Sequence, residues 1–272
     1  MSHDPESKCA LCQQVAPLRN SHIVSEFLYG TLYDGKHRFK TYGEAGEPVV
    51  GMEQRGTRER LLCDDCEKRF CRYERVAALF YQGTIAAFAA PQAEMQYDGG
   101  LTFTRVGKDA KPTTEAVPEL LRVEGVDYAA LKLFLLSLLW RMGVSQLHYF
   151  HEVELGPHEV RLREMLLRDD PGEPHEYACQ MCIIEADGRL ITDYQSQPQK
   201  SRHEGRTFYR FYSTGIRFDF CVSNRPIHPG MVELYCVNRK RDFVWWVNSI
   251  HKHPDLAAEL MRFGAAMGWD KS

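Results

Sequence analysis

The sequence predicts an α+β fold in which a cysteine-bearing N-terminal part precedes a part that mixes helices with an antiparallel sheet. Three observations lead to this prediction. Two Cys-x-x-Cys motifs flank extended segments, and the second motif opens a long amphipathic helix. A strongly apolar helix begins the second half of the chain. Segments rich in aromatic and β-branched residues, which favour strands, follow that helix.

The chain between the two cysteine motifs is expected to be mostly extended. Residues 21–24 predict a short strand that leads into Ser25–Tyr33. Lys36–Tyr42 and Pro48–Gln54 predict the arms of a hairpin around the glycine-containing turn Gly43–Gly46.

A helix is expected next, from about Asp65 to about Ala90. Asp64 and Asp65 suit its N-terminus, because carboxylates stabilise the positive end of the helix dipole. Apolar residues at helical spacing give it one broad face, made of Val76, Leu79, Phe80, Gly83 and Phe88.

Three regions are expected along the chain: a domain at 1–90, a linker at 91–118 and a second domain at 119–272. The linker holds proline, glycine and threonine with little pattern, apart from a strand at Leu101–Val106. The expected elements after it are helices at Tyr128–Met142, at about Pro157–Leu167 and from His253 to Gly264 or Met267, and strands at Tyr177–Glu185, Thr207–Tyr212, Ile216–Val222, Val232–Asn238 and Phe243–Val247.

The composition favours an ordinary globular protein in the cytoplasm. The net charge of −3 provides no overall basic field, so any contact with nucleic acid must come from a local patch. The first residues lack the basic and apolar regions of a secretory signal. The most apolar run, Leu131–Trp140, is too short to span a bilayer and is expected to be a buried core helix. We therefore expect no membrane partner.

Two Cys-x-x-Cys motifs predict one structural zinc ion held by Cys9, Cys12, Cys63 and Cys66. Zn²⁺ prefers four tetrahedral ligands of this softness, and clustered cysteines in a reducing compartment bind metal more often than they form disulfides. The intervening segment, 13–62, is longer than in a simple zinc ribbon and would form an insertion. The alternative is that the four cysteines are unpaired core residues.

Other cysteines are expected to be structural. Cys71 follows the second motif inside the helix and is expected to be packed rather than ligating. Cys179 and Cys182 form a third Cys-x-x-Cys motif in a strand-like run, where alternation places them on opposite faces.

The order of three motifs resembles the HNH (ββα-metal) nuclease superfamily over about the first 75 to 90 residues. These motifs are Cys9-x-x-Cys12, Ser21-His22-Ile23 and Cys63-x-x-Cys66-Glu67. The resemblance implies a zinc-stabilised ββα-type finger. It also implies that a histidine of the first strand activates water, while nearby side chains hold a catalytic Mg²⁺ or Mn²⁺ on the scissile phosphate.

By position, His22 matches the family's general base. Ser21 stands where an acidic residue is usual, and Glu67 stands where histidine or asparagine is usual. The middle asparagine has no clear counterpart. The alternative for His22 is a structural histidine that hydrogen-bonds the backbone of a small zinc module.

Two glutamates of the helix are candidate ligands of a catalytic ion. Glu67 and Glu74 lie seven residues apart and so share a helix face, and carboxylates suit Mg²⁺ or Mn²⁺. Glu74 is slightly preferred, because Glu67 is so close to the zinc cysteines. The alternative is a solvated helix face with local ion pairs.

Two basic stretches could contact nucleic acid. Residues 55–75 carry seven basic and five acidic residues, a net charge of +2, and residues 198–217 carry five and one, a net charge of +4. Aromatic residues, which can stack on bases, interleave with the second stretch. The alternative is a strand with one core face and one solvated face. The candidate contacts are Arg58, Arg69, Arg72, Arg206 and Arg210.

Two functions are left open by these features. The first is an HNH-like metal-dependent endonuclease with a C-terminal domain for substrate or partner choice, and DNA is expected ahead of RNA as its partner. Defence against foreign DNA, including phage, is suggested by analogy alone. The second is a non-catalytic zinc module that binds nucleic acid or protein. The oligomeric state is not predicted.

Overall fold

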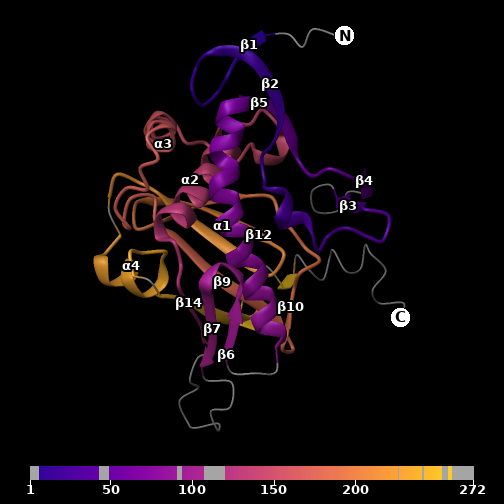
Figure 1. The fold of residues 1–272 in the computed structure, drawn as a ribbon, viewed down its shortest axis with the longest axis vertical. Helices are drawn as coiled ribbons and strands as arrows, with labels where there is room; N and C mark the ends of the chain where they lie inside the picture. Colours follow the sequence, from indigo (N-terminus) through magenta and orange to yellow (C-terminus); the bar gives the residue numbers. More distant parts are fainter. Residues whose placement is uncertain are drawn as a thin grey trace.

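The computed structural model describes residues 6–42, 49–90, 94–106, 120–225, 227–240, 242–252 and 257–258. Helices and a large, mostly antiparallel sheet occur together with an N-terminal cysteine cluster beside a helix, which confirms the α+β class. Figure 1 places the three-stranded N-terminal sheet at one end of the long helix α1 and the strands of the large sheet toward the other.

The N-terminal sheet pairs two strands that lie far apart in the sequence. Its order is β1-β2-β5, with β1 at Glu6–Lys8, β2 at Val15–His22 and β5 at Arg58–Cys63. Both pairings are antiparallel, and His22 lies opposite Arg58. Helix α1, Asp64–Ala89, starts directly after β5. The order of the paired strands and the helix is therefore strand, strand, helix.

The segment between β2 and β5 begins with a 3-10 helix, η1, at Glu26–Tyr29. It continues into β3 at Phe39–Tyr42 and β4 at Val49–Glu53. These strands pair antiparallel, which confirms the predicted hairpin. Its turn, Gly43–Gly46, lies outside the described residues.

The large sheet has the order β11-β12-β13-β9-β14-β8-β7-β6, with β10 paired to β9. Its pairs are antiparallel except for the parallel pair β14 and β9. Its strands are β6 (Glu94–Tyr97), β7 (Leu101–Val106), β8 (Leu120–Glu124), β9 (Cys179–Ala186), β10 (Arg189–Leu190), β11 (Gln199–His203), β12 (Arg206–Ser213), β13 (Ile216–Val222) and β14 (Asp242–Ser249). Strands β6 and β7 fall within the expected linker, and the division into domains stays a prediction.

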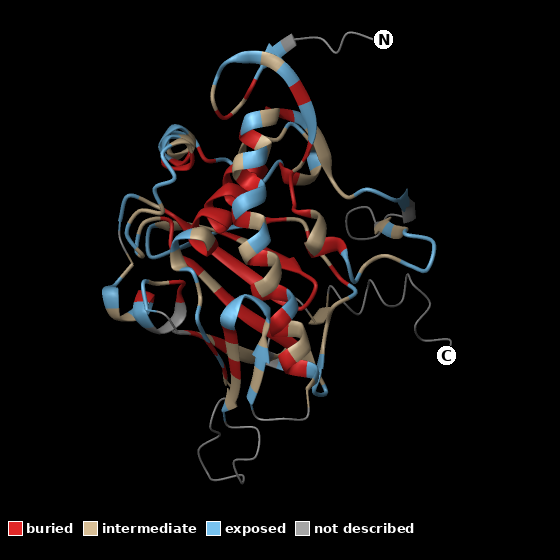
Figure 2. Ribbon diagram, in the orientation of Figure 1, coloured by how far each residue is buried: buried red, intermediate tan, exposed pale blue. Residues whose placement is uncertain are grey.

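The second half contains the predicted helices α2 (Tyr128–Val144) and α3 (His158–Leu167). Figure 2 shows α2 buried along most of its length, as expected for a core helix. Short 3-10 turns are η2 (Asp98–Gly100), η3 (His148–Phe150) and η4 (Ile250–Lys252). None of the described helices combines the length and apolar character needed to cross a bilayer.

The strand predicted at Val232–Asn238 is wrong. Helix α4, Pro229–Tyr235, occupies most of this range. Pro229 stands at the start of the helix, and the His228 ring accepts a hydrogen bond from the Gly230 N–H. These start signals prevail over the strand-favouring composition of the segment. The last predicted helix lies almost entirely outside the described residues.

Helix α1 joins the N-terminal sheet to the large sheet. Its 26 residues span about 39 Å at 1.5 Å per residue. It packs on α2 and β7, and Phe80 stacks on Trp245 of β14 with ring centroids 5.2 Å apart. A Cβ at Gly83 would lie 2.5 Å from the Phe103 ring, so only glycine permits this close approach to the sheet. One hydrophobic cluster includes residues of α1, α2, the N-terminal sheet and the large sheet.

Lys132 of α2 is fully buried and predicts a pH dependence of stability. Its Nζ donates to the carbonyl oxygens of Glu176 and Tyr177, and burial lowers its pKa to about 8 from 10.5. Between those pH values the unfolded chain binds more protons at this lysine, so stability rises with pH, by about 3 kcal/mol. Urea unfolding of wild type and Lys132→Met should show this rise in the wild type alone. Parallel pH curves for the two proteins would contradict the assignment.

Candidate functional site

Four cysteines gather between β2, β5 and the start of α1. Cys9 and Cys12 lie in the turn before β2, Cys63 ends β5, and Cys66 lies in the first turn of α1. Their sulfur atoms all lie within 4.8 Å of one another. The Cys12 and Cys63 sulfurs are 3.7 Å apart, close to the edge of about 3.8 Å expected around a tetrahedral ion with bonds of about 2.3 Å. The group could therefore bind a structural metal such as zinc.

Hydrogen bonds preorganise this group. The Cys63 N–H donates to the Cys9 sulfur at 3.3 Å, and the Ala10 N–H donates to the Leu61 carbonyl at 3.0 Å. A hydrogen bond from the Cys66 thiol lowers the pKa of Cys9 to about 4, and the same contact raises the pKa of Cys66. Metal binding would release the protons that remain on the group.

The remaining cysteines differ in their surroundings. Cys71 is exposed on α1, so the expectation that it is packed is wrong. Helical spacing from Cys66 carries it away from the core face, and it is outside the four-cysteine group. Cys179 and Cys182 belong to separate hydrophobic clusters, which confirms that they occupy opposite faces of β9.

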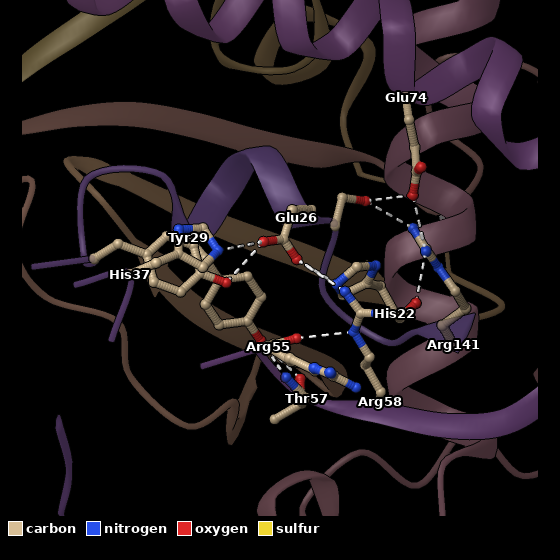
Figure 3. Close-up of polar contacts among 11 residues, drawn as sticks. His22, Glu26, Tyr29, His37, Arg55, Thr57, Arg58, Glu74 and Arg141 are labelled. Atoms are coloured by element: carbon tan, nitrogen blue, oxygen red, sulfur yellow. Dashed lines mark hydrogen bonds and ion pairs between the residues drawn. The ribbon is translucent and has the colours of Figure 1, made fainter. Parts of the chain in front are cut away.

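His22 ends β2 and is in direct contact with a carboxylate that sequence reasoning missed. Its Nε2 contacts Oε2 of Glu26, four residues later, where η1 turns the chain back over the strand end. Oε2 also lies 3.4 Å from Nη2 of Arg58, and Oε1 accepts a 2.7 Å hydrogen bond from the Tyr33 hydroxyl. Figure 3 shows Glu26 between His22 and Arg58 on one side and His37 on the other. The His37 Nε2 is 3.9 Å from Oε1.

The surroundings of His22 favour its neutral form. Burial and then the positive charge of Arg58 lower the pKa of His22, and the Glu26 carboxylate opposes them only in part. A neutral imidazole can accept a proton near pH 7. Because Nε2 faces Glu26, Nδ1 is the nitrogen left to do so.

Glu74 of α1 is held by a buried arginine from the second half of the chain. Oε1 of Glu74 accepts a 2.9 Å hydrogen bond from Nη1 of Arg141, and the Ser25 hydroxyl donates to the same oxygen at 2.5 Å. Nη1 also donates to the His22 carbonyl at 2.7 Å. Burial raises the pKa of Glu74, but Arg141 and then Ser25 outweigh burial and hold this pKa below its usual value. Arg141 thus ties α2 to the end of β2.

Glu67 is also largely buried on α1. Burial raises the pKa of Glu67, and hydrogen bonding from Ser21, the residue before His22, partly offsets this. Its Oε1 is buried without a hydrogen bond among the described residues. The structure thus places both predicted glutamates beside β2, as the sequence suggested, but neither contacts the His22 ring directly. Their catalytic roles stay predictions.

A polar pocket of about 360 Å³ adjoins Glu26 and Arg58. The other residues that line it come from the segment between β2 and β5, and they are Lys36, His37, Gln54 and Arg55. These four are exposed, whereas Glu26 and Arg58 are half-buried. The Arg58 Nε donates to the Arg55 carbonyl at 2.9 Å, which fixes the position of Arg58 beside Glu26.

The other predicted nucleic-acid contacts lie in ion pairs away from this pocket. Arg69 and Arg72 both pair with Asp169, Arg206 pairs with Glu204, and Arg210 pairs with Asp219. In the second basic stretch the aromatic residues Tyr209, Phe211 and Tyr212 are buried. Those rings pack into the protein core and so do not form a stacking surface. Of the five predicted nucleic-acid contacts, only Arg58 lies beside Glu26 and opposite His22.

Sequence reasoning missed two residues of the site, Glu26 and Arg141. Glu26 lies four residues after His22, a spacing that brings side chains together in a helical turn and was a usable signal. Arg141 follows an apolar helix far along the chain, and no local pattern links it to His22.

No protein-family model, no curated protein and no solved structure matches this chain.

Proposed function

We propose that this protein is an HNH-like nuclease that hydrolyses phosphodiester bonds in nucleic acid, with DNA as the expected substrate. The observation that carries the proposal is the contact of His22 with Glu26 at the end of β2, beside a pocket whose lining includes three cationic side chains. The strand, strand, helix order around the cysteine group supports the HNH-like part of the proposal. Zinc is the metal proposed for the four cysteines, where it would organise the fold.

The proposed chemistry uses His22 as the general base. The Glu26 carboxylate lies in ion-pair contact with Nε2 and favours the tautomer that carries its hydrogen there, which leaves Nδ1 to take a proton from water. The water oxygen then bonds to phosphorus as the bond from phosphorus to the leaving oxygen breaks. Arg58 lies beside Glu26 and can stabilise negative charge on the phosphate. His37 lines the pocket, and its protonated form can give a proton to the leaving oxygen.

The expected dependence on Mg²⁺ or Mn²⁺ stays a prediction. Glu26 is the one carboxylate among the described residues that line the pocket, and His22, Tyr33 and Arg58 already contact it. Glu74 is likewise engaged by Arg141. Mg²⁺ prefers several free oxygen ligands. This donor set does not fit a preformed Mg²⁺ site, and no step above depends on one.

The second candidate is a non-catalytic zinc module that binds nucleic acid or protein. The ion pair that occupies Glu74 favours it, because that carboxylate is then not free to bind a catalytic ion. Such a module would bind nucleic acid with a strong dependence on salt and would show no turnover.

Cleavage assays separate the two candidates. Purified zinc-loaded protein is incubated with plasmid, single-stranded DNA and RNA, each with no added metal, with Mg²⁺ and with Mn²⁺. We expect cleavage of DNA, and we expect His22→Ala to slow it by about 10²–10⁴-fold, the usual contribution of a general base. The variant should keep its zinc content and its unfolding midpoint. If all three substrates stay intact under every condition, the nuclease proposal fails and the binding module is favoured.

A further inference from the structure

Two cations at the rim of the pocket have no carboxylate partner within the described ranges of the chain. They are Lys36 and Arg55, both exposed and both lining the pocket. The nearest acidic residue in sequence to Lys36 is Asp34, whose Oδ2 pairs with Arg38 and whose Oδ1 accepts from the Lys36 and Arg38 N–H groups. Asp34 is therefore already engaged by Arg38. By contrast, Arg19, Arg58, Arg69 and Arg72 each pair with an acidic side chain.

The charge of the pocket favours an anion. Lys36, Arg55 and Arg58 supply three positive charges against the single negative charge of Glu26, a net charge of +2 with His37 neutral. Every lining side chain is polar, so an apolar ligand would gain little from entering. Phosphate oxygens are among the acceptors that arginine and lysine donors bind most strongly.

We call the half-buried residues of the pocket its floor and the exposed residues its rim. The two groups would contact different parts of a ligand. The floor holds Arg58 and Glu26, next to His22, where the scissile phosphate is proposed to react. The rim holds Lys36 and Arg55, together with the Gln54 amide and the His37 ring, which stacks on Tyr33 with centroids 3.8 Å apart.

We propose that Lys36 and Arg55 form a phosphate-binding subsite that holds the nucleic-acid strand at a phosphate next to the scissile one. The proposal rests on the proposed function for the identity of the strand, but the binding itself needs no catalysis. The same phosphate chemistry occurs in free nucleotides. A strand is favoured because Arg58 and the rim cations can then bind successive phosphates at once.

Fluorescence anisotropy with a labelled single-stranded DNA oligonucleotide tests this subsite. All proteins carry His22→Ala, so that the strand stays intact during the measurement. We expect Lys36→Ala/Arg55→Ala to raise the Kd at least tenfold at 100 mM salt. Loss of two phosphate contacts should also reduce the slope of log K against log salt by about 1.4, at about 0.7 per contact for a single strand.

A matched double variant removes the same charge elsewhere. Arg189→Ala/Arg225→Ala takes two exposed cations from β10 and from the segment after β13, both outside the two basic stretches. It should leave the Kd within about twofold and the salt slope unchanged. If both double variants weaken binding equally, or if the rim variant binds like the parent, the subsite proposal is overturned.

Competition with ATP distinguishes a strand from a free nucleotide. We expect ATP at millimolar concentration to displace the oligonucleotide only weakly. Strong displacement that depends on Lys36 and Arg55 would overturn the strand as the occupant. The two proposals can fail separately. If the wild type leaves DNA intact but Lys36→Ala/Arg55→Ala still weakens binding as expected, only the cleavage proposal is refuted. If the wild type cleaves DNA but Lys36→Ala/Arg55→Ala binds the oligonucleotide as tightly as its parent, only the subsite proposal is refuted.

Discussion

Cys63→Ser is expected to lose bound zinc and to unfold the N-terminal part of the protein. Cys63 joins the end of β5 to the metal group, and its N–H also donates to the Cys9 sulfur. Structural zinc contributes about 10–16 kcal/mol in zinc-finger peptides, which matches or exceeds the whole stability of a typical domain. The N-terminal sheet is small, with β1 only 3 residues long, and the cysteine group joins its strands to the start of α1.

Elemental analysis and hydrogen exchange measure this effect. The wild type should contain one zinc per chain, and Cys63→Ser should contain much less. The backbone amides of β2, β5 and the first turns of α1 should lose protection in the variant. Cys71→Ser is the matched control, because Cys71 is an exposed cysteine of α1 outside the group. A zinc-free wild type, or a Cys63→Ser protein with full zinc and full protection, would contradict the assignment.

Arg141→Met is expected to lower the free energy of unfolding by about 3–5 kcal/mol, the usual cost of removing one partner of a buried ion pair. The Arg141 side chain is 2% exposed, and its loss leaves the Glu74 carboxylate, which is only 24% exposed, without its cation. Burial alone raises the pKa of Glu74, so the variant should also favour a protonated Glu74. Methionine keeps much of the packing against Phe70.

Urea unfolding at pH 7 tests this prediction, and a double variant tests its cause. Arg141→Met/Glu74→Gln removes the unpaired charge and should regain part of the lost stability. The matched control is Arg168→Met, which breaks the exposed pair with Glu164 and should cost less than about 1 kcal/mol. If Arg141→Met and Arg168→Met lower the free energy of unfolding by the same amount, Arg141 does not tie α2 to β2.

The direction of the Glu74 pKa shift determines how the stability from this ion pair depends on pH. The wild-type pKa of Glu74 is lowered, so the stability from the pair is present above the ordinary carboxyl pKa of about 4.5. This stability is lost as the pH falls through the lowered folded value. The difference between wild type and Arg141→Met should therefore shrink in acid.

Local patterns in the sequence predicted much of the fold. The bounds of β7 and β13 match the predicted strands, and α1 lies within one residue of its predicted ends. The two cysteine motifs placed all four residues of the metal group, because each motif brings two sulfurs together through local geometry. Such features need only the residue types and the spacing along a short segment.

The rest of the fold and site required tertiary information. β11 is exposed along its whole length and has no apolar face to mark it as a strand. Arg141 reaches His22 only because α1 and α2 pack side by side. The carboxylate that contacts His22 is Glu26, since η1 reverses the chain at the end of β2, whereas Glu67 and Glu74 face Ser21 and Arg141.

The central claim is that His22 and Glu26 together cleave nucleic acid. The most direct test measures the single-turnover cleavage rate of Glu26→Gln beside His22→Ala and Glu152→Gln, an exposed carboxylate variant in the turn after η3. Glutamine keeps the size of the side chain but removes the charge that orients the imidazole. We predict that Glu26→Gln and His22→Ala both slow cleavage at least 100-fold while Glu152→Gln does not. Cleavage by folded, zinc-loaded Glu26→Gln at the wild-type rate would contradict the account.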